Sequence, residues 1–159
     1  MSFPQKIYTT KEVCAAKELI NQGYKHNLSV DGSNDFETKV NQAIEYLKTA
    51  GYYDYLRTYL KEIKEIDGMT QLRETEVSVW ANKFAVENPV DAASLLVQKA
   101  YSMKEYLDGE LYYGGNAEKR SVVKRIEFLQ ILKEKTSDSA VKQECQRLLD
   151  MWAESSLSF

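Results

Sequence analysis

The side chains able to do chemistry are few in this chain of 159 residues, and they form no catalytic pattern. His26 is the only histidine, and no H-E-x-x-H or paired Cys/His spacing accompanies it. A Ser–His or Cys–His pair would need His26 as its base, far in sequence from Cys145 and reachable from Cys14 only through loop folding. The sequence therefore predicts no metal and no cofactor, and it favours a non-enzymatic protein.

One segment partly resembles a calcium-binding loop. Asp31, Ser33 and Asp35 have the spacing of the first three ligands, but Phe36 stands where the loop needs glycine. The twelfth position holds Gln42 instead of glutamate. A turn followed by a helix cap is the better interpretation of these residues.

Tyrosine is abundant, with eleven copies, and two adjacent tyrosines fall in a predicted loop. Tyr112 and Tyr113 have no helical period that would bury them, and tyrosine is a favoured residue at protein interfaces. Gly114-Gly115 follow at a helix start, where backbone N–H groups can hold an anion. We expect a binding surface at Tyr112–Gly115, extended by Tyr53 and Tyr55.

A third local feature is the basic segment 117–135. From Lys119 to Lys135, its cations outnumber the two acids Glu127 and Glu134 and are scattered around the helix instead of gathered on one face. This scatter disfavours nucleic-acid binding, and a solvated helix face is the preferred interpretation. The cations are Lys119, Arg120, Lys124, Arg125, Lys133 and Lys135.

The elements that must position these residues are predicted to be helices. Apolar spacing and cap residues place helices after Thr9, after Asn34, over 52–66, over 70–88, over 88–108, after Asn116 to about Lys135, and over 139–153. Residues 24–33 have turn chemistry and no helical period. Segments 1–8 and 154–159 are expected to be extended or frayed.

The helix 88–108 is the expected centre of the fold. Asn88 and Pro89 form a strong start signal, and apolar residues including Leu96, Met103 and Leu107 cover most of its circumference. Two polar strips, Glu76/Lys83/Glu87 and Asp91/Gln98/Glu105, could line a pocket or face solvent. A helix with so little polar surface is normally enclosed by others.

These patterns predict an all-α fold: one domain, 1–159, with about seven helices in antiparallel hairpins over 35–67, 70–107 and 117–153. A compact bundle is favoured over HEAT/TPR-like stacking, because no signature repeats at a fixed period. The net charge of −3 is mild, and no apolar run is long enough to span a bilayer. We expect a cytoplasmic protein with reduced thiols.

Three hypotheses for function follow. The first is a protein–protein interaction or adaptor module that binds another protein or a second copy of itself. The second is a small-ligand-binding protein or enzyme with a polar pocket between helices. The third is weak nucleic-acid binding through helix 117–135.

Overall fold

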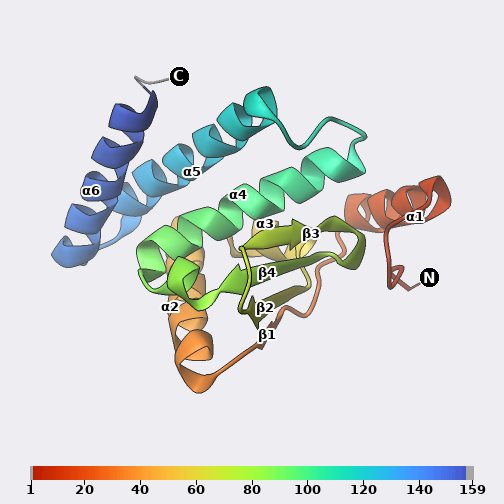
Figure 1. The fold of residues 1–159 in the computed structure, drawn as a ribbon, viewed down its shortest axis with the longest axis horizontal. Helices are drawn as coiled ribbons and strands as arrows, with labels where there is room; N and C mark the ends of the chain where they lie inside the picture. Colours follow the sequence, from red (N-terminus) through yellow and green to blue (C-terminus); the bar gives the residue numbers. More distant parts are fainter. Residues whose placement is uncertain (1, 157–159) are drawn as a thin grey trace.

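The computed structural model describes residues 2–156 and shows a mixed α/β fold (Figure 1). The predicted all-α class is wrong, because a four-stranded sheet accompanies six α-helices in the described chain. The elements in chain order are α1 (Thr10–Asn21), β1 (Ser29–Asp31), α2 (Asn34–Ala50), α3 (Tyr53–Tyr59), β2 (Glu62–Ile66), β3 (Gln71–Arg73), η1 (Glu74–Glu76), β4 (Ser78–Asn82), η2 (Lys83–Val86), α4 (Pro89–Leu107), α5 (Gly115–Lys135) and α6 (Ser139–Ser156).

Three sequence predictions fail in the segment that forms the sheet. The helix predicted over 52–66 ends at Tyr59 and continues as β2, and the helix predicted over 70–88 is β3, η1, β4 and η2. The turn segment 24–33 also contains β1. Leu72 and Val79 are seven residues apart, a separation that fits two turns of one helix. In the structure they are instead cross-strand partners in β3 and β4. Short strands and helices cannot be separated by the spacing of a few apolar residues.

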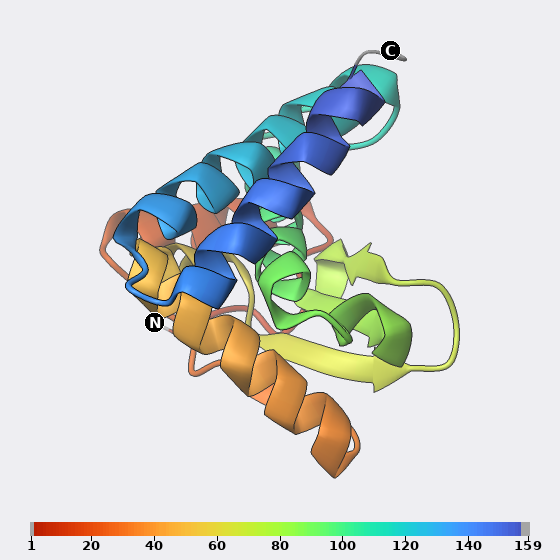
Figure 2. The same cartoon turned by 90° about the vertical axis from the view of Figure 1, so that its left-hand side faces the viewer.

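The sheet has the strand order β1-β2-β4-β3, in which the first three strands are parallel and β3 is antiparallel to β4. The register aligns four apolar residues in one row across it: Val30, Ile63, Val79 and Leu72. Ile63 and Val79 are fully buried in the core, with the helices gathered on one side of the sheet (Figure 2). This apolar row is what holds the sheet against the helices.

The predicted central helix is confirmed as α4. Asn88 is its N-cap and accepts hydrogen bonds from the backbone N–H groups of Val90 and Asp91. Leu96, Met103 and Leu107 are buried. Figure 1 shows α5 lying along α4 and α6 crossing α5, so α4 is enclosed between these helices and the sheet. Burying this apolar circumference is the main stabilising contribution of the helix.

Of the three expected hairpins, 117–153 is the one that the described chain forms, as α5 and α6. The pairs 35–67 and 70–107 each contain strands, and a sheet inside the fold excludes a HEAT/TPR-like stack. Helix starts were predicted closely: Thr9 and Glu12 form the expected capping box of α1. Two predicted caps are shifted, because Ser33 caps α2 and Gly114 precedes α5.

The N-terminal segment, residues 2–8 of the described chain, contains no helix or strand and is anchored to the rest of the fold. Ile7 is fully buried, and its backbone N–H donates to the carbonyl of Thr75. Its carbonyl accepts from the phenol of Tyr106 at 2.6 Å. At the other end, α6 continues to Ser156, and residues 157–159 lie outside the described residues.

Gly32 allows a close approach between the β1–α2 turn and β2. A Cβ at this position would lie 2.6 Å from Cδ1 of Phe36 and 2.8 Å from Cβ of Glu65. We expect Gly32→Ala to destabilise the fold by about 1–3 kcal/mol, because the buried Phe36 ring must move. Chemical denaturation measures this change. Gly115→Ala is the matched control, since no atom lies within 4 Å of its Cβ position, and it should leave stability within about 1 kcal/mol.

Candidate functional site

The loop between α4 and α5 carries the tyrosine pair singled out in the sequence. Tyr112 is half-buried, with its ring edge-on to Tyr106 (centroids 5.4 Å apart) and to Tyr113 (5.2 Å). Tyr113 is 64% exposed. The pair therefore has one member held by neighbouring rings and one member open on the surface.

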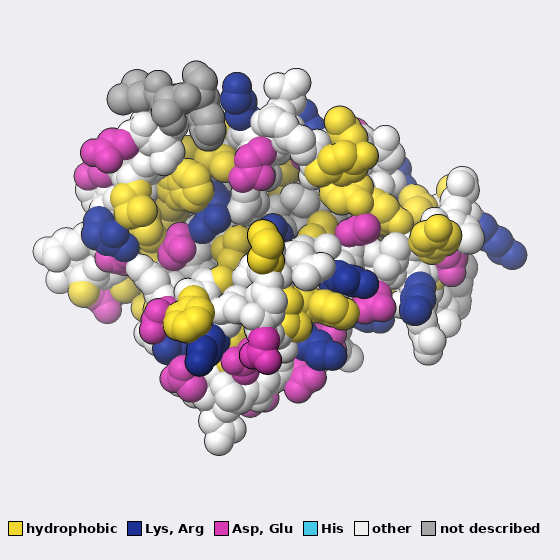
Figure 3. All heavy atoms as spheres, in the orientation of Figure 1, with side chains coloured by type: hydrophobic (Ala, Val, Ile, Leu, Met, Phe, Trp, Pro, Cys, Tyr) yellow, Lys and Arg dark blue, Asp and Glu magenta, His cyan; other side chains and the backbone are white. Residues whose placement is uncertain are grey.

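Two further residues join this pair into a larger surface. Tyr8 is 78% exposed and Leu111 is 61% exposed, and the Tyr106–Ile7 hydrogen bond holds the segment of Tyr8 beside the end of α4. We call Tyr8, Tyr106, Leu111, Tyr112 and Tyr113 the aromatic patch. Figure 3 shows hydrophobic side chains gathered over the α4–α5 loop and beside α1. Sequence patterns did not connect Tyr8 or Tyr106 with the tyrosine pair, because these residues are distant from it along the chain or belong to another predicted element.

Two cations near the aromatic patch pair with carboxylates. Lys17 lies 3.4 Å from a carboxylate oxygen of Asp108, and Arg120 lies 2.7 Å from one of Glu105. Arg120 also donates to the carbonyl of Leu111 at 2.8 Å, which fixes the loop against α5. In both pairs the carboxylate offsets the charge of the cation.

Three carboxylates near the patch take part in none of the ion pairs of the described residues. Glu12 accepts hydrogen bonds from the backbone N–H groups of Tyr8 and Thr9, Glu110 is exposed in the loop next to Leu111, and Glu74 is hydrogen-bonded to the phenol of Tyr112. Burial, together with this bond and the charge of Glu74, raises the pKa of Tyr112 to about 12. The phenol is therefore protonated at neutral pH and donates to Glu74. These carboxylates place negative charge at the edge of the patch.

The two glycines shape the loop and the start of α5. Gly114 has φ 91°, a left-handed conformation that suits glycine, and Gly115 is the first residue of α5. Glu118 already places a negative charge in the first turn of this helix. Asn116, the cap predicted from the sequence, lies inside α5.

Tyr53 and Tyr55 do not extend the aromatic patch. The Tyr53 ring lies under Lys48 (4.8 Å from Nζ to centroid) and near Arg57 (5.3 Å). The Tyr55 ring contacts Tyr59 edge-on, with centroids 5.3 Å apart. Among the described residues, no ring contact joins this cluster on α3 to Tyr112 or Tyr113. The structure thus separates the six predicted site residues into two places.

The strip Asp91/Gln98/Glu105 neither lines a pocket nor lies wholly in solvent, since Gln98 and Glu105 are buried. Arg125, buried on α5, donates to Oγ of Ser94 (3.1 Å), Oε1 of Gln98 (3.0 Å) and Oδ1 of Asp91 (2.8 Å). The ring of Trp152 on α6 covers the guanidinium, 4.8 Å from its centroid. This network joins three helices and uses most of the donors of Arg125.

The other polar groups of this strip also have hydrogen-bond partners within the protein. Gln98 donates to Oγ of Ser121 at 3.0 Å, and Glu105 accepts two hydrogen bonds from Arg120. Two of the cations that suggested nucleic-acid binding, the exposed Arg120 and the buried Arg125, are therefore paired with residues of this strip. Buried charges need such partners, so this strip has a structural role.

The second strip, Glu76/Lys83/Glu87, does not exist as one face. Glu76 lies in η1 and Lys83 in η2, on either side of β4, and Glu87 is exposed just before α4. A helix face was required to bring these three side chains together, and the chain forms a strand there instead.

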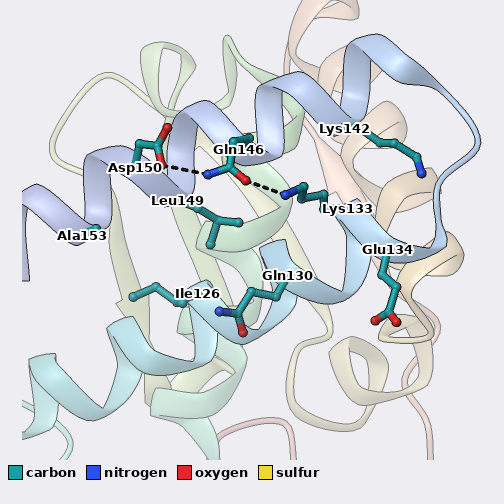
Figure 4. A pocket seen from close by; sticks show the side chains of 9 residues that line it. All are labelled: Ile126, Gln130, Lys133, Glu134, Lys142, Gln146, Leu149, Asp150 and Ala153. Carbon is teal, nitrogen blue, oxygen red and sulfur yellow. Dashed lines mark hydrogen bonds between the residues drawn. The ribbon is translucent and has the colours of Figure 1, made fainter.

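A groove of about 910 Å³ lies between α5 and α6 (Figure 4). Ile126, Leu149 and Ala153 supply its apolar surface. Gln146 bridges it, accepting from Lys133 and donating to Asp150. Its charged groups, including Glu134 and Lys142, mix both signs, so the groove shows no preference for one class of ligand.

A second hollow, of about 390 Å³, lies where α3, α4 and α5 meet. Three tyrosines line it, Tyr52, Tyr55 and Tyr101, above the buried Val97. Its remaining lining consists of charged side chains, Lys104, Lys124 and Glu127. We call this hollow the tyrosine pocket.

No group of three or more potential metal ligands occurs among residues 2–156. Cys14 is exposed and Cys145 is buried in the hydrophobic core, and both are free thiols. Burial raises the pKa of Cys145 to about 11, so it is protonated at neutral pH. Such a thiol is a poor nucleophile.

The fold and these surfaces define a mixed α/β protein with an exposed aromatic patch and a small tyrosine-lined pocket. No protein-family model, no curated protein and no solved structure matches the chain. None of the described helices combines the length and apolar character that a bilayer crossing requires.

Proposed function

We propose that this protein is a protein-binding module that holds a basic segment of its partner on the aromatic patch. The observation that carries the proposal is the grouping of Tyr8, Leu111 and Tyr113, each more than 60% exposed, at one end of α4. Isolated exposed apolar residues are ordinary, but a contiguous group of this kind marks an interaction site. Tyrosine contributes a large contact area at low entropic cost.

The charge around the patch supports a basic partner. Glu12, Glu74 and Glu110 lie near the patch outside the ion pairs of the described residues, while Lys17 and Arg120 are each paired with a carboxylate. Arginine and lysine side chains can place their charge over a tyrosine face and reach a neighbouring carboxylate. Lysine or arginine side chains separated by apolar residues would match both features of the surface.

An affinity measurement with a defined probe tests this proposal. A labelled arginine-rich peptide, followed by fluorescence anisotropy, should bind the protein, and a glutamate-rich peptide of equal length should not. Replacing both Tyr8 and Tyr113 with serine removes two rings that the cations of the peptide would contact. Binding should therefore weaken by about tenfold or more.

The control for this measurement is a matched pair of exposed apolar residues elsewhere. Val123 on α5 and Met151 on α6 are each about half exposed and lie outside the aromatic patch. Val123→Ser with Met151→Ser should leave the affinity within about twofold. Equal loss in both double variants, or equal binding of the acidic peptide, would count against the proposal.

A further inference from the structure

The tyrosine pocket combines aromatic walls with cations, and neither the aromatic patch nor its proposed partner uses it. Its lining comes from three helices that are distant in sequence, with Tyr52 and Tyr55 from the α3 region, Tyr101 from α4 and Lys124 from α5. Its volume of about 390 Å³ falls in the range of small-molecule sites. A preformed hollow of this size can enclose one small aromatic molecule.

The walls offer ring faces and hydroxyl groups. Tyr55 packs against Tyr52 (centroids 6.1 Å apart) and Tyr59, which fixes its position. Burial raises the pKa of Tyr55, so its hydroxyl is protonated and can donate a hydrogen bond. The Tyr52 ring is held edge-on against the buried Phe128. These rings are therefore preorganised, which lowers the entropic cost of binding.

Two ammonium groups border the same space. Lys124 lies over the Tyr101 ring (5.3 Å to centroid) and is 3.5 Å from a carboxylate oxygen of Glu127. Lys104 is bonded to Asp108 at 2.8 Å, one turn further along α4. Both lysine side chains are partly exposed and carry flexible stems, so they can turn toward an anion that enters between them.

We infer that the tyrosine pocket binds a small aromatic carboxylate. The aromatic ring packs against Tyr52 and Tyr101, and the carboxylate lies between the ammonium groups of Lys104 and Lys124. Neutral aromatic molecules lack the ion pairs, and small aliphatic acids lack the ring contacts, so both bind more weakly. This site is separate from the aromatic patch, and its test is independent of the proposed function.

Titration of the isotopically labelled protein with 4-hydroxybenzoate tests this inference, with 4-hydroxybenzyl alcohol and acetate as reference probes. We expect 4-hydroxybenzoate to shift the amide signals around Tyr55, Tyr101 and Lys124. Each reference probe should bind at least about tenfold more weakly, the effect of one lost charge-assisted contact.

Lys124→Met should reduce the affinity for 4-hydroxybenzoate by about tenfold. Lys142→Met is the matched control, because Lys142 lines the groove between α5 and α6, and its effect should stay within about twofold. Thermal unfolding of both variants checks that they fold. Equal affinity for the acid and the alcohol, unchanged affinity in Lys124→Met, or loss in Lys142→Met alone would overturn the inference.

Discussion

Replacing Arg125 with methionine is expected to destabilise the folded protein by about 3–4 kcal/mol. The substitution leaves Oγ of Ser94, Oε1 of Gln98 and the carboxylate of Asp91 without their donor. Gln98 and Ser94 are buried, so water cannot readily replace the guanidinium. The guanidinium also supports the ring of Trp152 on α6. Urea denaturation followed by circular dichroism measures the loss.

A surface arginine provides the control for this prediction. Arg147 is exposed on α6 and pairs with Glu144 one turn away, so Arg147→Met should cost less than about 1 kcal/mol. Adding Gln98→Leu to Arg125→Met should recover part of the stability. Two apolar side chains then lie in contact, in place of a buried amide oxygen that has lost its hydrogen-bond donor. Equal effects of Arg125→Met and Arg147→Met would show that the buried network does not stabilise the α4–α5–α6 contact.

The second large expected effect is a loss of stability in mild acid caused by His26. This side chain is buried between the rings of Phe3 and Tyr24, and its Nε2 has no hydrogen-bond partner among the described residues. Burial, with the nearby charges of Lys61 and Arg57, lowers the pKa of His26 from 6.5 to about 4. The folded protein therefore resists protonation of this imidazole.

The direction of the pH effect follows from this lowered pKa. The unfolded chain binds a proton below about pH 6.5 while the folded chain does not, so the unfolded state gains stability as the pH falls toward 4. The free energy of unfolding should decrease by about 2 kcal/mol from about pH 7 to about pH 4.5. Urea denaturation at a series of pH values measures the decrease.

His26→Phe serves as the comparison, because it removes the titrating group and keeps an aromatic ring beside Phe3 and Tyr24. Its stability should vary much less over the same pH interval, whatever its value at neutral pH. Parallel pH profiles for the wild type and His26→Phe would mean that another group causes the acid sensitivity.

The sequence predicted the helices that are long and capped. α2, α4, α5 and α6 were found because apolar residues repeat through several turns and because start signals such as Asn88-Pro89 are strong. The prediction of secondary structure from the sequence failed over 60–87. The strands there have three to five residues, with too few apolar positions to show an alternating period. Register decides which apolar residues meet there, as with Leu72 and Val79, and register is a property of the folded sheet.

The candidate site was predicted only in part. Tyr112 and Tyr113 were singled out because no period explained them, and the structure places Tyr113 on the surface. Tyr8 could not be connected to them, because its place depends on the long-range hydrogen bond between Tyr106 and Ile7. Arg125 was grouped with surface cations, since the distance along the chain to Asp91 and Ser94 hides their contact. Contacts between distant segments are what local patterns do not encode.

The most direct measurement of the proposed function is amide chemical-shift mapping of the labelled protein during titration with an arginine-rich peptide. We expect the largest shifts on Tyr8, Glu74 and residues 110–114, with little change along the groove between α5 and α6. Shifts centred on that groove, or none at the aromatic patch at saturating peptide, would contradict it.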